Sequence, residues 1–240
     1  MNPPRFVADA WLTEKLGKSA FHLVGDIGGL GRSQAELRRQ LRGRLFADAK
    51  IAVEEGAAAG AMLAMGFALI DTNLRFTMPR TAAPAWNAKA DVGFATPDMA
   101  QAVGGIAEDA FVYDRFHRDP AVGAEVARRL KGDWARNFFA GKRGDWMVVA
   151  RERDTPVGFL QLLRGPQDTL VIDLIAVTGS HRRGGRAGAM IAFAAAHCPA
   201  AGPLVVGTQL ANLASVRLYE GLGFRLDAAH YVFHHHGSSR

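Results

Sequence analysis

Apolar and polar positions divide the chain into two stretches of alternating strands and helices, separated by a proline-rich segment. In the second stretch, three apolar runs with strand-like alternation are joined by short polar turns, which predicts an antiparallel meander. Runs with alternating helical and strand spacing follow. The predicted elements are strands at 146–151, 156–163 and 170–177, a helix at 185–197, a strand at 204–210, a helix at 213–221 and a strand at 231–235.

Two predicted helices come before this meander. Apolar residues recur at helical spacing between Ala102 and Ala110, and Asp98 is placed to cap that helix. A second helix is predicted over residues 122–139. Together these elements predict an α/β fold with a mixed, largely antiparallel sheet and flanking helices.

The N-terminal stretch, up to Phe76, predicts a smaller α/β unit. Ser33 and Glu36 have the spacing of a capping box, so a helix is expected over residues 34–42. Residues 79–97 hold three prolines and lack helical periodicity, which predicts a linker that includes the first strand region of the next unit. The other elements expected in this stretch are a strand near 49–53, an alanine-rich helix over 56–66 and a strand over 68–76. The domains expected are a lobe of residues 1–78 and a larger domain of residues 98–240.

A weak internal repeat connects the two stretches. Residues 64–67 read Ala-Met-Gly-Phe and residues 221–224 read Gly-Leu-Gly-Phe, each between a predicted helix and a predicted strand. When the two copies are aligned without gaps, Glu55 lies opposite Asn212 and Met62 lies opposite Tyr219. Either two helix ends resemble each other by chance, or the first copy keeps a scaffold that has lost two polar side chains.

Composition is that of a soluble globular protein. The 240 residues are 49% hydrophobic and 22% charged, and a chain of this length buries a core without covalent staples. The single cysteine, Cys198, cannot form an internal disulfide, and no Cys/His spacing resembles a zinc site. The N-terminus lacks the apolar segment of a signal peptide, and residues 56–70 are too short and alanine-rich to span a bilayer. A cytoplasmic protein that does not contact a membrane is therefore expected.

The charge balance is basic, with a net charge of +6 and a pI of about 9.9. Such a balance suits either nucleic acid or a small polyanionic ligand. The arginines are scattered rather than grouped, so we expect no nucleic-acid binding. The run of residues 234–236, three histidines, is expected to be a frayed terminus or an expression remnant rather than a metal site, and no metal is expected.

Residues 181–190 carry the most informative chemistry. They follow an apolar strand and open a helix, and their glycines let backbone amides approach a ligand closely. Helix-start amides favour an anion, whereas Arg182, Arg183 and Arg186 would each be disfavoured there by about 0.3–1 kcal/mol unless an anion binds. The alternative is a solvated basic turn. A dinucleotide-binding motif is excluded because the glycine spacing is wrong and no acidic residue lies about 20 positions further on.

These residues resemble the first signature of the GCN5-related (GNAT) N-acetyltransferase superfamily, Q/R-x-x-G-x-G/A. The downstream residues 212–215 and 218–224 resemble its second signature, in the family's order and separation. The resemblance implies acetyl-CoA as cosubstrate, direct attack by a primary amine, and Tyr219 as the acid that protonates the leaving thiolate. A phenol suits that role, although without the motif Tyr219 would read as a core aromatic residue. The cofactor-binding residues implied are Ile175, Ala176, Val177, Arg182, Arg183, Gly184, Gly185, Arg186, Ala187, Gly188 and Asn212.

Within the superfamily the chain resembles the bacterial TDP-fucosamine acetyltransferases. The resemblance is strongest from Gly184 through Asn212 and Tyr219 to Tyr231. It implies a truncated, degenerate GNAT-like N-terminal lobe, a nucleotide-linked 4-amino-4,6-dideoxyhexose as acceptor, and a homodimer. The longer loop at 178–182 departs from that family's pattern.

The acceptor side is less defined. The loop residues Arg115 and His117 lie between two predicted helices, where this superfamily often shapes the acceptor pocket. A base for the amine would come from Asp114, His117, Asp173 or Glu220. The alternatives are that His117 is an ordinary surface histidine, that the acceptor is a peptide, polyamine or antibiotic amine, or that the chain binds acyl-CoA without catalysis. Cys198 is not expected to carry the acyl group.

Overall fold

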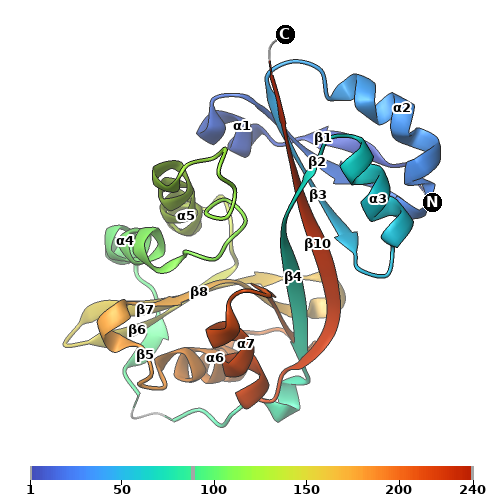
Figure 1. The fold of residues 1–240 in the computed structure, drawn as a ribbon. Helices are drawn as coiled ribbons and strands as arrows, with labels where there is room; N and C mark the ends of the chain where they lie inside the picture. Colours follow the sequence, from blue (N-terminus) through green and yellow to red (C-terminus); the bar gives the residue numbers. More distant parts are fainter. Residues whose placement is uncertain (1, 88–89, 239–240) are drawn as a thin grey trace.

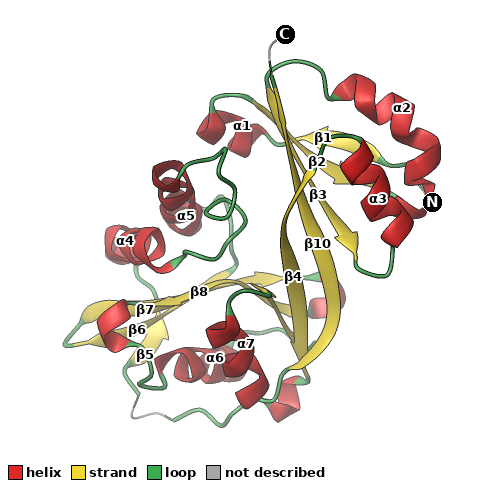
Figure 2. Ribbon diagram, viewed as in Figure 1, coloured by secondary structure: helices red, strands yellow, loops and turns green. Residues whose placement is uncertain are grey.

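A computed structural model describes residues 2–87 and 90–238 and contains the expected mixed α/β architecture (Figures 1 and 2). The strands are β1 (Arg5–Ala8), β2 (Ser19–Val24), β3 (Leu45–Ala52), β4 (Ala68–Met78), β5 (Val92–Phe94), β6 (Trp146–Glu152), β7 (Thr155–Arg164), β8 (Leu170–Val177), β9 (Leu204–Gln209) and β10 (Arg225–Gly237). The helices are α1 (Ala10–Leu16), α2 (Leu30–Gln40), α3 (Gly56–Ala64), α4 (Ala100–Ala110), α5 (Ala124–Phe139), α6 (Arg186–His197) and α7 (Leu213–Gly221).

One sheet runs through the described residues, in the order β1-β2-β3-β10-β4-β9-β8-β7-β6-β5. Helices α1, α4 and α5 pack on one face of the sheet, and α2, α3, α6 and α7 pack on the other (Figure 1). The two-residue alternation of β6 shows why. Met147 and Val149 face α4 and α5, whereas Val148 and Ala150 face α6. Both faces are covered, so these strands are apolar on both sides.

The last strand lies inside the N-terminal half of the sheet. β10 pairs antiparallel with β3 on one side and with β4 on the other, and β4 in turn pairs antiparallel with β9. In Figure 1 the long red strand crosses between the blue-green strands of the first 80 residues. The C-terminal strand therefore closes a sheet that the N-terminal residues begin.

The internal repeat is present in three dimensions. β3-α3-β4 corresponds to β9-α7-β10, and the parallel pair β2/β3 corresponds to the parallel pair β8/β9. Both helices end the same way: Gly66 and Gly223 have φ of 87° and 92°, and the next amide donates back to the carbonyl of Met62 (3.1 Å) or Tyr219 (3.0 Å). The order β3-β10-β4-β9 means that the two copies exchange their last strands. The expected α/β fold of the N-terminal lobe is thus confirmed, while its degenerate character stays a prediction, as does its division at residue 78, where the sheet is continuous.

Two predicted caps are wrong. Helix α2 begins at Leu30, so Ser33 lies inside it, because a 3-10 turn over Ile27–Gly29, capped by Asp26, leads directly into the helix. Asp98 lies within another 3-10 turn, Pro97–Met99, which Pro97 starts, and α4 begins only at Ala100. In both places a short helical turn precedes the helix and displaces its start.

Among the predicted strands, the last one is the furthest from its observed bounds. β10 begins six residues before the expected 231, because its polar positions find partners, as in the ion pair between Asp227 and Arg75 of β4. β1, α1 and β2 had no individual prediction. Helix α1 is short and is held by Asp9, whose side chain accepts from the amide of Leu12 (2.8 Å), and by Gly17 in the left-handed conformation.

Replacing Phe233 by alanine should destabilise both halves together. Its side chain is buried against α2 and α3 from a strand that both lobes share, so Phe233→Ala should cost about 3–5 kcal/mol of unfolding free energy. Urea unfolding followed by circular dichroism and tryptophan fluorescence measures this. Leu226→Ala, at an exposed position of the same strand, is the control and should stay within about 0.5 kcal/mol of wild type. Separate transitions for the two lobes would contradict the shared role of β10.

Candidate functional site: a cavity where the sheet divides

The sheet divides between β8 and β9. These parallel strands are paired only where residues 170–172 face residues 204–206. Beyond that point β8 stays paired with β7 up to Val177, and β9 stays paired with β4 up to Gln209. Since each strand follows its other neighbour, the two diverge and leave backbone amides and carbonyls without a strand partner. Such an edge can accept an extended ligand arm by strand-like hydrogen bonds.

A cavity of about 500 Å³ occupies this divergence. It joins the two faces of the sheet: the start of α6 and one side of α7 line it from one face, and the loop after α4 lines it from the other. The predicted site residues that line it are Ile175, Ala176, Val177, Arg182, Arg183, Gly185, Arg186, Ala187, Gly188, Asn212 and Tyr219. Gly184 is not among the lining residues. The structure therefore brings the two sequence signatures to one cavity, although the role of each residue stays a prediction.

The start of α6 suits an anion. Its first turn has no side-chain cap, and the chain enters it through Arg183 and Gly185, whose φ angles are +65° and +75°. Uncapped amides together with the helix dipole attract negative charge. Arg186 is paired with Glu152 (2.7 Å), whereas the side chain of Arg183 makes no hydrogen bond or ion pair with the described residues. Of the predicted cations, only Arg186 has an ion-pair partner among the described residues, since Arg182 donates to the neutral carbonyl of Val177 (3.0 Å).

Tyr219 is a buried residue of α7 that lines the cavity. Its ring packs between Phe76 (5.9 Å) and Phe224 (5.6 Å), and the residue is 2% exposed. The hydroxyl makes no hydrogen bond within the described ranges, and it is not among the sealed polar atoms, so it opens on the cavity. Burial raises the pKa of this phenol well above its ordinary value, so it is protonated at neutral pH.

Asn212 has a structural task as well as a place in the cavity wall. It caps α7, with its side-chain oxygen accepting from the amide of Ser215 (3.2 Å). Its amide nitrogen makes no hydrogen bond with any described residue and remains available to a ligand. The equivalent position in the N-terminal lobe, Glu55, makes no side-chain cap bond.

The candidate bases are mostly occupied elsewhere. Asp173 accepts hydrogen bonds from Trp134 (3.0 Å), Gln161 (3.0 Å) and Arg143 (2.7 Å twice). His117 is hydrogen-bonded through Nδ1 to Asp114 and its Nε2 is buried without a partner, so it is not a surface histidine and does not line the cavity.

Of the proposed bases, only two residues line the cavity, Asp114 and Asp173, while Glu220 is exposed on α7. Arg115 lies in a second cavity, of about 490 Å³, beside Trp11 and Trp134. The structure thus brings neither Arg115 nor His117 to the central cavity.

Lys131 lines the central cavity, and no sequence motif pointed to it. It stands on the buried face of α5, four residues from Ala127 and four from Ala135. A charged residue at the centre of an apolar helical stripe was the signal that could have revealed it.

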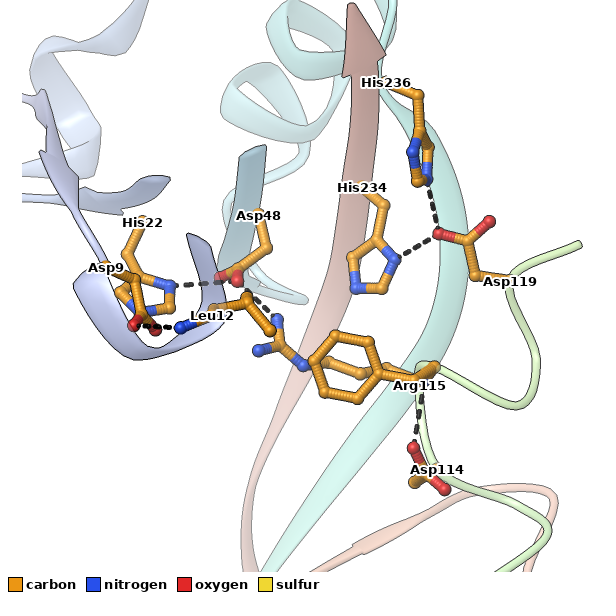
Figure 3. A network of polar contacts seen from close by, with 10 residues as sticks. Asp9, Leu12, His22, Asp48, Asp114, Arg115, Asp119, His234 and His236 are labelled. Atoms are coloured by element: carbon orange, nitrogen blue, oxygen red, sulfur yellow. Dashed lines mark hydrogen bonds and ion pairs between the residues drawn. The ribbon is translucent and has the colours of Figure 1, made fainter. Parts of the chain in front are cut away.

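The loop of residues 111–123, between α4 and α5, is tied to the N-terminal lobe by a buried carboxylate, Asp48 (Figure 3). Arg115 pairs with Asp48 of β3 (2.6 Å), which also accepts from His22 of β2 (2.9 Å). Burial alone would raise the pKa of Asp48, but Arg115 and His22 outweigh burial and hold it at about 2. The lobe without the catalytic signature thereby positions a wall of the cavity.

The histidines of β10 are ordered, contrary to the frayed terminus expected. His234 is buried, and Asp119 of the same loop accepts from His234 (2.6 Å) and from His236 (2.7 Å). Two imidazoles and a carboxylate are a donor set that binds transition metals. Lys18, however, donates to Nδ1 of His236 (2.9 Å), so its Nε2 carries the proton given to Asp119. A metal on that nitrogen would need the opposite tautomer, so the surroundings fit a hydrogen-bonded anchor better.

Cys198 lies outside the cavity, at the end of α6. It is buried, and burial raises the pKa of its thiol to about 11. A protonated, enclosed thiol cannot act as an acyl carrier at neutral pH. None of the helices in the described ranges is long and apolar enough to cross a membrane.

Comparison with known proteins gives the cavity a context. Residues 100–224 match the family described as the acetyltransferase (GNAT) family. The spore coat polysaccharide biosynthesis protein SpsD of Bacillus subtilis (strain 168) is 30% identical over 151 residues, which cover 60% of this chain and 50% of that protein. This chain therefore matches about half the length of that curated relative.

Two solved structures share the fold over both lobes. A GCN5-related N-acetyltransferase from Kribbella flavida has a TM-score of 0.59 at 17% identity and covers 90% of this chain and 80% of its own. A tandem GNAT protein from the clavulanic acid biosynthesis pathway has a TM-score of 0.58 at 15% identity, with 93% and 77% covered. At these identities the likeness concerns the fold alone.

The Asp48 network makes a signed prediction about acid stability. The pKa of Asp48 is about 2 in the folded protein and about 3.9 in the unfolded chain. Its ionised carboxylate therefore contributes fully to folding stability above about pH 4, and this contribution is lost as the pH falls through about 2. The free energy of unfolding of Asp48→Asn, measured with urea, should therefore fall by about 1 kcal/mol less than that of wild type between pH 5.5 and pH 3. The raised pKa of His22 does not interfere, because its contribution is full below about pH 6.5. Asp98→Asn, at an exposed position, is the control, and an Asp48→Asn profile parallel to wild type would refute the prediction.

Proposed function

The chain belongs to the acetyltransferase (GNAT) family, and we propose that it is an acetyl-CoA-dependent N-acetyltransferase whose acceptor is a primary amine. The observation that carries the proposal is the cavity at the divergence of β8 and β9. It combines an uncapped helix start with the free Arg183 at one side and the hydroxyl of Tyr219, which opens on the cavity. The pyrophosphate of acetyl-CoA would bind at α6, and the pantetheine arm would pair with the open edge of β8 at Ile175–Val177.

The reaction is a direct transfer. The lone pair of the amine attacks the thioester carbonyl carbon, the C–S bond breaks, and the leaving sulfur takes the proton of the Tyr219 hydroxyl. The proton that the nitrogen loses balances the one given by Tyr219, so the phenol is protonated again at the end of the cycle. The raised pKa of Tyr219 keeps the acid form populated before each turnover.

The acceptor that we propose is the 4-amino group of a nucleotide-linked 4-amino-4,6-dideoxyhexose. Two observations favour a sugar acceptor: the motif resemblance to TDP-fucosamine acetyltransferases, and the similarity to a protein named for spore coat polysaccharide biosynthesis. A panel of primary amines, comprising thymidine- and uridine-diphosphate amino sugars, polyamines, peptides and aminoglycosides, tests the acceptor through thiol release from acetyl-CoA. Release with the sugar nucleotides supports the proposal. Release with another amine class alone keeps the transferase and overturns the sugar acceptor.

Removing the Tyr219 hydroxyl should slow chemistry without weakening cofactor binding. Tyr219→Phe keeps the ring packed against Phe76 and Phe224, so we expect folding as in wild type and a kcat lower by about 100-fold or more. The measurements are thiol release at saturating acetyl-CoA and calorimetric titration of acetyl-CoA. An unchanged kcat would show that Tyr219 is a packing residue only.

Asn212 allows its two tasks to be separated. Asn212→Ser keeps an oxygen that can cap α7 but removes the amide donor, so stability should stay within about 0.5 kcal/mol while the Kd for acetyl-CoA rises severalfold. Asn212→Ala removes both and should also lose about 1 kcal/mol of unfolding free energy. Equal acetyl-CoA affinity in wild type and Asn212→Ser would leave Asn212 with the capping task alone.

A further inference from the structure

Lys131 is a buried lysine with one long ion pair and no hydrogen bond among the described residues. It is 8% exposed, and its ammonium lies over the rings of Trp134 (4.8 Å) and Phe111 (5.2 Å). The nearest carboxylate oxygen belongs to Asp114 at 4.0 Å, beyond hydrogen-bond length. Nζ makes no hydrogen bond within the described ranges, and it is not sealed, so the ammonium faces the cavity that it lines.

The carboxylates near Lys131 also accept hydrogen bonds from closer donors. Asp114 accepts from Nδ1 of His117 and from the amide of Phe116 (3.0 Å), and Asp173 is held by both ends of the Arg143 guanidinium. A buried ammonium that must be desolvated without compensation costs several kcal/mol, so such groups are normally paired. Burial lowers the pKa of Lys131, and Asp114 is the described anion that opposes this most, so a further anion in the cavity would stabilise the ammonium.

A second unpaired cation stands on the same side. Lys50 follows Asp48 by two positions on β3, so its side chain points to the same face, toward the loop that carries Arg115. Desolvation lowers the pKa of Lys50 most, and the charges of Arg115 and Lys131 lower it further. The charges of Asp48 and Asp173 act in the opposite direction. Lys50 makes no hydrogen bond or ion pair with a described residue. Lys50 is exposed and lines neither cavity, but its charge acts on Lys131 from the same face of the sheet.

We propose that Lys50 and Lys131 form an anion subsite that binds a phosphoryl or carboxylate group of the acceptor, so that the enzyme selects amines bearing a negative charge. The inference rests on the proposed acetyl transfer, and it assigns these lysines to the acceptor rather than to acetyl-CoA. The reason is position: Lys131 comes from α5, on the face opposite to the start of α6.

The subsite also favours the reactive form of the acceptor. An amine attacks only when it is unprotonated, and two nearby positive charges disfavour an ammonium ion. Once the acceptor anion neutralises the lysines, that bias weakens, so the anionic group chiefly orients the amine. The subsite is therefore expected to act mainly on the KM for the acceptor.

The test compares Lys131→Met and Lys50→Met with wild type and with Arg129→Met. Arg129 is an exposed residue of the same helix, so its variant removes one positive charge outside the cleft. Thymidine diphosphate is titrated calorimetrically into protein saturated with acetyl-CoA, which blocks the cofactor site. Steady-state kinetics then use three primary amines: a thymidine diphosphate-linked 4-amino-4,6-dideoxyhexose, its neutral methyl glycoside, and β-alanine as a carboxylate.

We expect each lysine variant to raise the KM for an anionic acceptor by about tenfold or more. If the bound anion is a phosphoryl group, the Kd for thymidine diphosphate should rise by a similar factor. The Kd for acetyl-CoA and the KM for the neutral glycoside should not change. Arg129→Met should match wild type. Lys131→Arg, which keeps the charge, should recover most of the affinity and guards against misreading a folding defect. A larger effect with the sugar nucleotide than with β-alanine identifies a phosphoryl group, and the reverse identifies a carboxylate.

Three results would overturn the subsite: no binding of either anion to the saturated protein, equal loss for neutral and anionic acceptors, or weaker acetyl-CoA binding in place of the acceptor effect. Failure of the proposed function has a different signature. In that case thymidine diphosphate or β-alanine still binds in a Lys131-dependent manner, while no amine in the panel releases thiol.

Discussion

The pairing of β10 between β3 and β4 is the interaction on which the rest of the structure depends. One strand from the C-terminus supplies backbone hydrogen bonds to both neighbours, and its alternate side chains complete two cores: Phe233 on the side of α2 and α3, His234 on the side of α5. Since β4 is held by β10 on one side, it can hold β9 on the other. The two lobes therefore share one continuous sheet, in which β10 of the second lobe pairs with β3 of the first and β4 of the first pairs with β9 of the second.

The cavity follows from this sheet. β9 is bound to β4 and β8 is bound to β7, so the two can separate after residue 172 without unfolding. Their separation leaves a passage through the sheet between two groups of helices. The helix-start amides and Tyr219 reach it from one face, and the loop of residues 111–123 reaches it from the other. A cofactor and an acceptor can thus approach one reacting centre from opposite sides, as a direct transfer requires.

The charged side chains near the cavity differ in how many partners surround them. Asp48, Asp119 and Asp173 are each surrounded by donors and fix the position of loops and helices. Lys131 lines the cavity with only a long ion pair to Asp114, and Lys50 is exposed on the same face of the sheet. The N-terminal lobe, which has Met62 where the other has Tyr219, therefore anchors the loop beside the cavity through Asp48.

Sequence alone determined the elements from residue 124 to residue 221 and the glycine- and arginine-rich turn before α6, because periodicity, glycine pattern and helix starts are local properties of the chain. It also indicated the repeat, through two glycines that end two helices. Tertiary structure alone decided the exchange of last strands, the divergence of β8 from β9, the burial of the β10 histidines and the place of Lys131 in the cavity. These depend on which distant segments pack together, as His234 with Asp119 and Arg115 with Asp48 do, and hydrogen bonds between residues more than 60 positions apart leave no periodic trace in the sequence.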